Sequence, residues 1–355
     1  MSAVINLSII VLSIYFLSII TDEFFIESLD EIARKWKLPS NVAGASLMAM
    51  GSSMPELSIA LLALVQDGGA HSDVGVGNIV GSAVFNILVI TGASALARPA
   101  KVTWQVVVRD CLIYSISIGL LLFTFQDGQI TLLETLMFLG LYAAYIYVLY
   151  QWHLLMPDGE MDIVDVLETE IQGEETKSGI YYQVTTQVAR FVRFLTGEPR
   201  QQYGRAFFVS ILLIIGISWL LLENAIAFAG AIGVPPILVA LTILAGGSSV
   251  PDLLASVFVA RDGKGEMAIS NAVGSNIFDI SIGLGLPWLL ILIFQGGPIA
   301  VGTADLASST MVLLSTVVVL FVFLSTGQQL SRREGAVLLL LYAAYVLWMW
   351  TGSLA

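Results

Sequence analysis

Long apolar segments dominate this sequence and leave few folds open to it. Ten segments of roughly 20 residues or more are each long enough to cross the hydrocarbon core of a bilayer as an α-helix. They are continuously apolar rather than alternating, which argues against a transmembrane β-barrel. With 57% hydrophobic and 12% charged residues, the composition is that of a multi-pass membrane protein. We predict an all-α membrane protein with ten transmembrane helices, at residues 3–32, 39–65, 73–97, 104–126, 129–152, 205–231, 235–260, 266–295, 306–326 and 334–352.

The basic residues predict the orientation of these helices. All fifteen Lys and Arg residues fall on one side of the ten-helix arrangement, and the positive-inside rule makes that side cytoplasmic. Both termini are then extracytoplasmic, and we expect the plasma or inner membrane of the cell. The two halves enter the membrane from opposite sides, which is the inverted-repeat plan of many secondary transporters. We therefore divide the chain into a first five-helix repeat (1–152), a cytoplasmic acidic linker (153–204) and a second, inverted five-helix repeat (205–355).

The linker is the one long hydrophilic stretch. Residues 158–175 contain acidic side chains and no basic one, but they lack the spacing and the glycine of an EF-hand loop. A solvated linker is favoured over a regulatory cation sensor. Residues 181–195 combine aromatic and apolar positions with two arginines, which predicts a short amphipathic helix at the cytoplasmic interface.

One short motif occurs once in each half. Residues 51–57 read Gly-Ser-Ser-Met-Pro-Glu-Leu, and residues 247–253 read Gly-Ser-Ser-Val-Pro-Asp-Leu. Each copy places an acid inside an apolar segment, where a carboxylate is costly unless it faces a cavity or a cation. A single copy would fit a helix kink that serves packing alone. Two copies with the acid in register favour a functional site.

A second pair of matches follows the first. Residues 78–86 read Asn-Ile-Val-Gly-Ser-Ala-Val-Phe-Asn, and residues 271–279 read Asn-Ala-Val-Gly-Ser-Asn-Ile-Phe-Asp. The Gly-Ser pairs allow close helix approach, and Asn86 and Asp279 each lie one helical turn beyond the serine. A third match, Leu-Tyr-Ala-Ala-Tyr at 141–145 and 341–345, supports the duplication.

The chemistry of these motifs is that of a hard-cation site. Pro55 and Pro251 interrupt helical hydrogen bonding inside their segments, so we expect the second and seventh helices to be broken. The breaks free carbonyls near residues 49–52 and 245–248, which in lipid need another partner such as a cation.

Carboxylates, hydroxyls and carbonyls together favour Ca²⁺ or Na⁺ over zinc or copper. Glu56, Asp252 and Asp279 bring up to three negative charges, with Asn86 and several serines as neutral ligands. Several Na⁺ ions, Ca²⁺ with a monovalent ion, or Ca²⁺ with a proton each balance that charge. We expect these transported ions and no cofactor, and no nucleic-acid partner.

At these residues the sequence resembles the cation/Ca²⁺ exchanger superfamily, whose two repeats carry Gly-Ser/Thr-Ser-x-Pro-Glu/Asp and Gly-Ser-x-x-x-Asn/Asp. The resemblance covers both halves apart from the linker. Residues 73–87 and 274–280 are most similar to the K⁺-dependent Na⁺/Ca²⁺ exchangers. An acid at the position of Asp279 is associated with K⁺ dependence in animal members. Some microbial Na⁺/Ca²⁺ exchangers also have Asp there, which leaves K⁺ use open.

The resemblance also implies a ligand set. Glu56 and Asp252 would be the central Ca²⁺ carboxylates shared with Na⁺, and Asn86 and Asp279 would complete the ligands. The remaining Na⁺ ligands would be the hydroxyls of Ser52, Ser53, Ser82, Ser248, Ser249 and Ser275 and the carbonyls of Ala49 and Ala245.

The predicted function is therefore secondary antiport of Na⁺ against Ca²⁺ by alternating access at one midplane site, with K⁺ co-transport left open. By resemblance, the first and sixth helices would slide against the rest of the bundle. H⁺/Ca²⁺ exchange is the nearest alternative, because the same carboxylates can carry protons. A cation channel is a more remote alternative. An intramembrane protease is disfavoured because the chain has neither a Gly-x-Gly-Asp nor a His-Glu-x-x-His signature.

Overall fold

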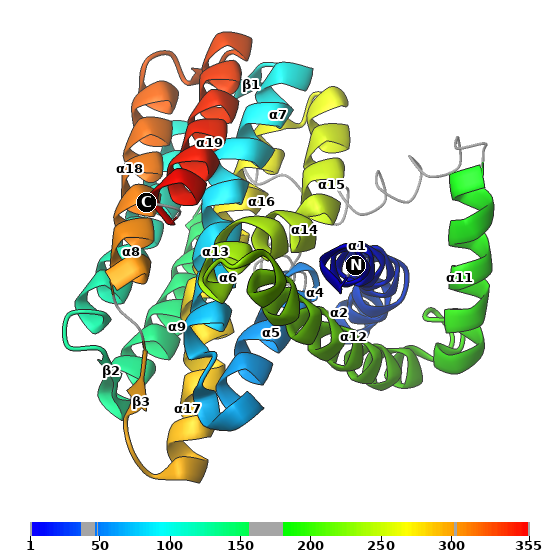
Figure 1. Cartoon of the computed structure of the whole chain (residues 1–355). Coiled ribbons are helices and arrows are strands. Elements are labelled where there is room, and N and C mark those ends of the chain that lie inside the picture. The colour runs from blue at the N-terminus through cyan, green and yellow to red at the C-terminus, as the bar shows by residue number, and fades with distance from the viewer. Residues whose placement is uncertain (1, 37–46, 48, 156–179, 302–303, 354–355) are drawn as a thin grey trace.

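The structure is a computed structural model that describes residues 2–36, 47, 49–155, 180–301 and 304–353. Within these ranges it is a bundle of helices with four very short strands (Figure 1). The elements of the first half are α1 (Ser2–Ile20), η1 (Thr21–Ile26), α2 (Glu27–Trp36), α4 (Ala49–Ser52), α5 (Met54–Val65), η3 (Gln66–Gly69), α6 (Ser72–Phe85), η4 (Asn86–Ile90), α7 (Thr91–Ala97), β1 (Ala100–Lys101), α8 (Trp104–Thr124), β2 (Gln129–Ile130) and α9 (Leu132–Leu155).

After α11 (Ile180–Thr196), the second half repeats much of this order. Its elements are α12 (Tyr203–Ile232), α13 (Pro236–Val239), η5 (Ala240–Leu244), α14 (Ala245–Ser248), α15 (Val250–Arg261), α16 (Gly265–Phe278), η6 (Asp279–Leu284), α17 (Gly285–Gln295), β3 (Ile299–Ala300), α18 (Ala304–Ser325), β4 (Gln329–Leu330) and α19 (Arg332–Ser353).

The membrane-spanning helices largely follow the apolar segments. In the described ranges, 8 helical stretches are long and apolar enough to cross a bilayer: Ser2–Trp36, Ser72–Ala97, Val107–Thr124, Leu132–Gln151, Tyr203–Ile232, Gly265–Phe294, Leu306–Ser325 and Arg332–Gly352. Residues 236–248 and 250–261 are together long and apolar enough for a further crossing, with a bend of 44° between them. The predicted helix at 39–65 begins in residues outside the described ranges, and its described part is α4 with the apolar α5. The count of ten therefore stays a prediction.

Both predicted helix breaks are present. Ser53 (φ −92°, ψ 7°) separates α4 from α5, and Ser249 (φ −88°, ψ 2°) separates α14 from α15. Each break falls two residues before the proline rather than at it. Proline is tolerated in the first turn of the following helix because the N–H groups of that turn have no intrahelical partner.

Two small antiparallel strand pairs join the halves, which the sequence did not predict. β1 pairs with β4, and β2 pairs with β3. In Figure 1, β1 lies near the top of the bundle and β2 and β3 near the bottom. Each pair therefore ties one strand of the first half to one strand of the second half, at opposite ends of the molecule.

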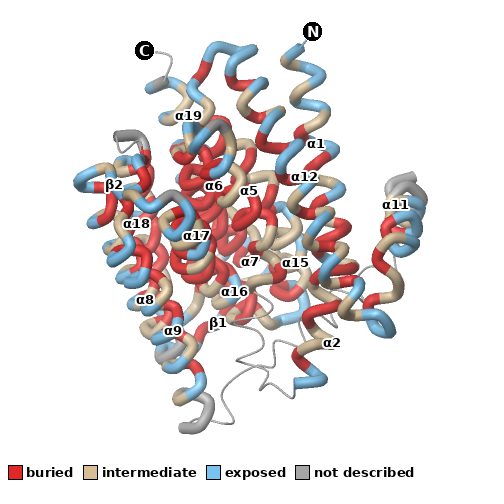
Figure 2. Tube along the Cα trace, turned by 90° about the horizontal axis from the view of Figure 1, so that it is seen from below, coloured by how far each residue is buried: buried red, intermediate tan, exposed pale blue. Residues whose placement is uncertain are grey.

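The buried core has two main parts. One apolar cluster joins α1, η1, α12 and η5, and the other joins α8, α9, α16, α17 and α18. α5 and α6 contribute side chains to both clusters. Figure 2 shows α5 and α6 in the buried centre, and it places the start of α1 and the end of α19 at the same end of the molecule.

α11 confirms the predicted amphipathic helix in the linker. It packs beside α1 and α12, where the Tyr15 hydroxyl hydrogen-bonds the Thr185 hydroxyl at 2.7 Å. Phe191 and Phe194 are exposed on its other face. The acidic residues 158–175 lie outside the described part of the chain.

Candidate cation site

Each helix break places an acid in the first turn of the helix that follows. Glu56 lies in the first turn of α5, and Asp252 lies in the first turn of α15. The N-terminal turn of a helix stabilises negative charge through its unpaired N–H groups and the helix dipole. The local sequence therefore both breaks the helix and makes the new helix start suitable for a carboxylate.

The first carboxylate lies among hydroxyls of both halves. Glu56 is buried, and the hydroxyls of Ser248 and Ser82 lie beside it. The Ser82 hydroxyl also hydrogen-bonds the Ser249 hydroxyl at 2.6 Å. Close packing of α6 on the second half makes this possible, because a Cβ on Gly81 would lie only 2.8 Å from the Ala245 Cβ. The structure thus brings four predicted site residues together across the two halves.

The second carboxylate shows the reciprocal arrangement. Asp279 begins the π-helical turn η6 in the second half, is buried, and has Ser53 of the first half beside it. Its counterpart Asn86 begins the π-helical turn η4. Such turns are rare and often occur at functional sites. The sequence placed the two residues at matching positions but did not predict the π-helical turns.

Asn86 is held in one orientation by two side chains of α16. Its Nδ2 donates to Asn276 Oδ1 at 2.9 Å and to Ser275 Oγ at 3.4 Å. Asn276 in turn donates to the Tyr114 hydroxyl at 2.9 Å and to the Ala83 carbonyl at 3.1 Å. Sequence reasoning missed Asn276 and Tyr114 as supports of the site. The signal available was that Asn276 stands in the second motif where the first has alanine.

Three oxygens of the site have no hydrogen-bond partner in the described part of the chain. They are Glu56 Oε2, Asn86 Oδ1 and Asp279 Oδ1, and all are buried. Buried polar atoms are rarely left without a partner. Oxygens from two carboxylates and one amide, oriented but not paired, are suited to a hard cation.

The carbonyls of Ala49 and Ala245 differ from expectation. Each accepts a helical hydrogen bond across the break, from Ser53 N–H at 3.1 Å and from Ser249 N–H at 3.3 Å. The hydroxyls of Ser52 and Ser248 also turn back to these same two carbonyls, at 3.5 and 3.3 Å. The expectation that the breaks free these two carbonyls is therefore wrong.

Proline instead removes the N–H that the carbonyl four residues earlier would accept. The affected carbonyls are those of Gly51 and Gly247. A sequence count of four residues back from each proline locates them.

Asp252 differs from the other two acids in exposure. It is partly exposed, whereas Glu56 and Asp279 are each 2% exposed. Both Glu56 and Asp279 experience the charge of Asp252. Within the described ranges, however, no three His, Cys, Asp or Glu side chains are spaced to hold one metal ion. An ion bound by these acids would therefore need neutral ligands, or a movement of the broken helices, to complete its coordination.

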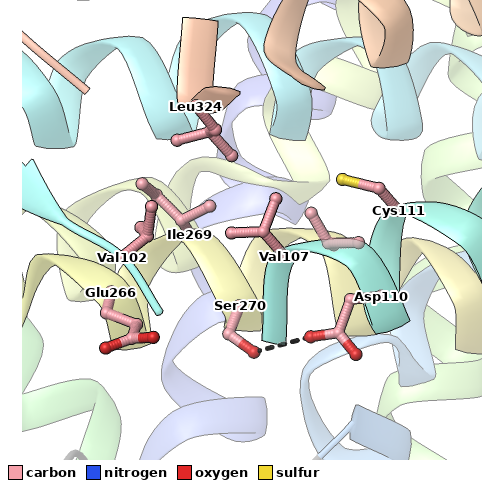
Figure 3. Close-up of a pocket in the computed structure, with 9 residues that line it drawn as sticks. Val102, Val107, Asp110, Cys111, Glu266, Ile269, Ser270 and Leu324 are labelled. Carbon is pink, nitrogen blue, oxygen red and sulfur yellow. Dashed lines mark hydrogen bonds between the residues drawn. The ribbon is translucent and has the colours of Figure 1, made fainter. Parts of the chain in front are cut away.

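A separate polar cluster lies between α8 and α16. Figure 3 shows Asp110 turned toward Ser270, whose hydroxyl donates to it at 3.1 Å. Arg109 Nε pairs with the same carboxylate at 2.8 Å, and both side chains are buried. Asp110 and Ser270 line a small pocket, and Val107 and Leu324 form part of its apolar lining. This cluster joins α8 to the second half and contains none of the predicted site residues.

Residues 5–151 and residues 205–351 each match the family described as sodium/calcium exchanger protein. The chain belongs to this family. The resemblance to the cation/Ca²⁺ exchanger superfamily is confirmed, and this family member is a multi-pass integral membrane protein.

Two curated relatives match this exchanger along most of its length. It is 30% identical to the sodium/calcium exchanger MaX1 of Methanosarcina acetivorans, over 96% of this chain and 97% of the relative. It is 29% identical to sodium/potassium/calcium exchanger 5 of Homo sapiens, over 92% of this chain and 79% of the relative. These relatives are transporters rather than enzymes.

Two solved structures share the fold. The H⁺/Ca²⁺ exchanger CAX superposes with a TM-score of 0.69 at 16% identity, over 96% of this chain and 82% of CAX. The sodium-calcium exchanger NCX_Mj superposes with a TM-score of 0.58 at 20% identity, over 97% and 98%. At these identities the likeness concerns the fold alone.

Proposed function

We propose that this protein exchanges Na⁺ for Ca²⁺ across the cell membrane by alternating access at one site between its two halves. The observation that carries the proposal is the set of buried, unpartnered oxygens on Glu56, Asn86 and Asp279. Such oxygens are the ligands that hard cations prefer. Because Na⁺ and Ca²⁺ would compete for the same limited charge, binding of one favours release of the other.

The remaining predicted ligands fit around this set. Asp252 is the more exposed of the three acids, and we expect an ion to meet it first. Ser82 lies beside Glu56, Ser53 beside Asp279 and Ser275 beside Asn86, and Ser249 hydrogen-bonds Ser82. The predicted ligands whose oxygens also take part in local helical bonds are Ser52, Ser248, Ser275, Ala49 and Ala245. A carbonyl oxygen has two lone pairs, so Ala49 and Ala245 stay in the proposed Na⁺ ligand set.

The proposed architecture is ten helices in two inverted repeats, with α4 and α5 ending the second crossing. A chain whose two ends lie at the same end of the bundle needs an even number of crossings, and Figure 2 shows such ends. The family match to both halves and the reciprocal strand pairs support the duplication. By the positive-inside rule, the Lys and Arg residues between the helices support a cytoplasmic linker and extracytoplasmic termini. The separate apolar cluster of α1 and α12 supports these two as the sliding pair.

Transport in vesicles tests the counter-ion. Purified protein is reconstituted, the vesicles are loaded with Na⁺, and uptake of radioactive Ca²⁺ is followed under an outward Na⁺ gradient. We expect uptake that requires the Na⁺ gradient. Uptake driven by a pH gradient and indifferent to Na⁺ would identify H⁺/Ca²⁺ exchange and overturn the proposal. A channel would pass Ca²⁺ down its own gradient without any counter-ion.

Substitutions test the site. Glu56→Gln and Asp252→Asn should each nearly abolish Ca²⁺ uptake, because each removes a charge that balances the divalent ion. Asp262→Asn is the matched control, since Asp262 is an exposed carboxylate just after the end of α15. Normal Ca²⁺ flux in Glu56→Gln would contradict the assigned site.

The same assay tests K⁺ co-transport. Ca²⁺ uptake is compared with and without K⁺ outside the vesicles, in the wild type and in Asp279→Asn. If K⁺ is co-transported, wild-type uptake should rise with K⁺, and the substitution should remove that dependence while leaving some exchange. Uptake that is indifferent to K⁺ in both proteins would assign plain Na⁺/Ca²⁺ exchange.

A further inference from the structure

Asn78 is a buried amide that the predicted ligand set does not use. It lies in α6, is 0% exposed, and neither Oδ1 nor Nδ2 has a hydrogen-bond partner in the described residues. An amide side chain offers two donors and two acceptor positions. A buried amide that satisfies none of them needs an explanation.

The position of Asn78 connects it to the carboxylate site. It lies one helical turn before Ser82 and therefore on the same face of α6. Ser82 is beside Glu56. The polar face of α6 thus extends from Ser82 toward the α5–α6 link, which we predict to be extracytoplasmic.

The packing of α5 on α6 places Asn78 level with Glu56. The two helices are in backbone contact, because a Cβ on Gly75 would lie 2.9 Å from the Ala60 Cα. Glu56 lies four residues before Ala60 in α5, and Asn78 lies three residues after Gly75 in α6. At about 1.5 Å per residue, their heights differ by only about 1.5 Å. Glu56 Oε2 also lacks a partner, so two unsatisfied groups lie at one level of the same helix pair.

The second half contains the counterpart in an accessible setting. Asn271 precedes Ser275 by one helical turn, as Asn78 precedes Ser82, but Asn271 is exposed. The acids differ in the same sense, with Asp252 partly exposed and Glu56 buried. At this level of the bundle, the amide and the acid of the second half are therefore more exposed than those of the first half.

We propose that Asn78 and Asn271 are paired access ligands, one for each side of the membrane. Asn78 Oδ1 would bind the partly dehydrated cation when the path beside α5 and α6 is open to the extracytoplasmic side. Asn271 would do the same on the cytoplasmic side, beside Asp252. An amide oxygen is a neutral hard ligand that suits both Na⁺ and Ca²⁺. This inference rests on the proposed antiport and adds a side-specific ligand to it.

Side-specific transport kinetics test the inference. Asn78→Leu keeps the approximate size and removes the oxygen, and Asn271→Leu is its matched partner. In oriented vesicles, Asn78→Leu should raise the half-saturating Ca²⁺ concentration on the extracytoplasmic side about tenfold or more, and leave the cytoplasmic value within about twofold. Asn271→Leu should show the mirror pattern. Equal shifts on both sides, or no shift, would overturn the inference.

Cysteine labelling gives a readout that does not depend on transport. Asn78→Cys and Asn271→Cys are made separately in a Cys111→Ala background, since Cys111 is the chain's single cysteine. A membrane-impermeant thiol reagent should label Asn78→Cys from the extracytoplasmic side alone and Asn271→Cys from the cytoplasmic side alone. Labelling of Asn78→Cys from the cytoplasmic side, or from neither side, would overturn the inference.

The two experiments separate this inference from the proposed function. Wild-type vesicles without Na⁺-driven Ca²⁺ uptake would refute the antiport, whatever the labelling shows. Normal wild-type exchange with kinetics in the Asn78 variants that do not depend on the side would refute the access ligands alone. If Asn78→Leu does not fold, Asn78→Ser, which keeps a shorter oxygen ligand, should show a smaller shift on the same side.

Discussion

The contact of α6 with the second broken helix allows a quantitative test of how packing builds the site. A Cβ on Gly81 would lie 2.7 Å from the Leu241 carbonyl carbon and 2.8 Å from the Ala245 Cβ. Carbon atoms in favourable contact are about 3.5–4.0 Å apart. Gly81→Ala therefore requires α6 to move by roughly 1 Å away from η5 and α14, because backbone atoms on the facing helix cannot rotate aside.

The expected effects follow from that displacement. Overpacking of a close contact costs about 1–3 kcal/mol of unfolding free energy. The next residue, Ser82, donates to or accepts from Ser249 at 2.6 Å, and a shift of roughly 1 Å would stretch this bond beyond the usual range. We expect a lower midpoint of thermal unfolding in detergent and weaker Ca²⁺ uptake in vesicles.

Gly140→Ala is the matched control for this test. Gly140 is an exposed mid-helix glycine of α9, and a Cβ at this position would meet no packed neighbour within 4 Å. Alanine there should leave transport unchanged and raise stability by up to about 1 kcal/mol through helix propensity. The packing argument is refuted if Gly81→Ala melts no lower than Gly140→Ala and transports Ca²⁺ normally.

Three further substitutions test other contacts. Asp110→Asn should lower the unfolding free energy by about 3–5 kcal/mol, because Asp110 pairs with the buried Arg109; an unchanged melting midpoint would contradict it. Asn276→Leu removes the hydrogen bonds that orient the Asn86 side chain, at about 1–3 kcal/mol for each group left unpaired, so both the melting midpoint and the Ca²⁺ affinity should fall. Arg200→Ala should lower the unfolding free energy by less than about 1 kcal/mol, because the Arg200–Glu27 ion pair lies at the surface. A larger loss in thermal unfolding would show that this ion pair holds the end of the linker in place.

The local sequence was sufficient to predict the helix breaks and the acids that follow them. Proline lacks an N–H, and this property is independent of tertiary context. The apolar segments likewise predicted most crossings, because hydrophobic length alone decides whether a helix can span a bilayer. The carbonyls of Ala49 and Ala245 were mispredicted, because each accepts the intact N–H of Ser53 or Ser249, whereas the missing proline N–H affects Gly51 and Gly247 instead.

Contacts between the halves lay beyond sequence reasoning. The pairing of β1 with β4 joins segments far apart in the chain, and such partners are chosen by how the helices pack rather than by local pattern. Asn276 is similar, because nothing in its own segment shows that Asn86 and Tyr114 lie within hydrogen-bonding distance.

The sequence by itself determined that this chain is a membrane bundle with a duplicated acidic motif in two broken helices. Each of those features depends on residues close together in the chain. The tertiary structure decided which oxygens of the site have partners, and that Glu56 is buried while Asp252 is partly exposed. Two nearly identical motifs acquire different surroundings because exposure depends on how the neighbouring helices pack around each of them.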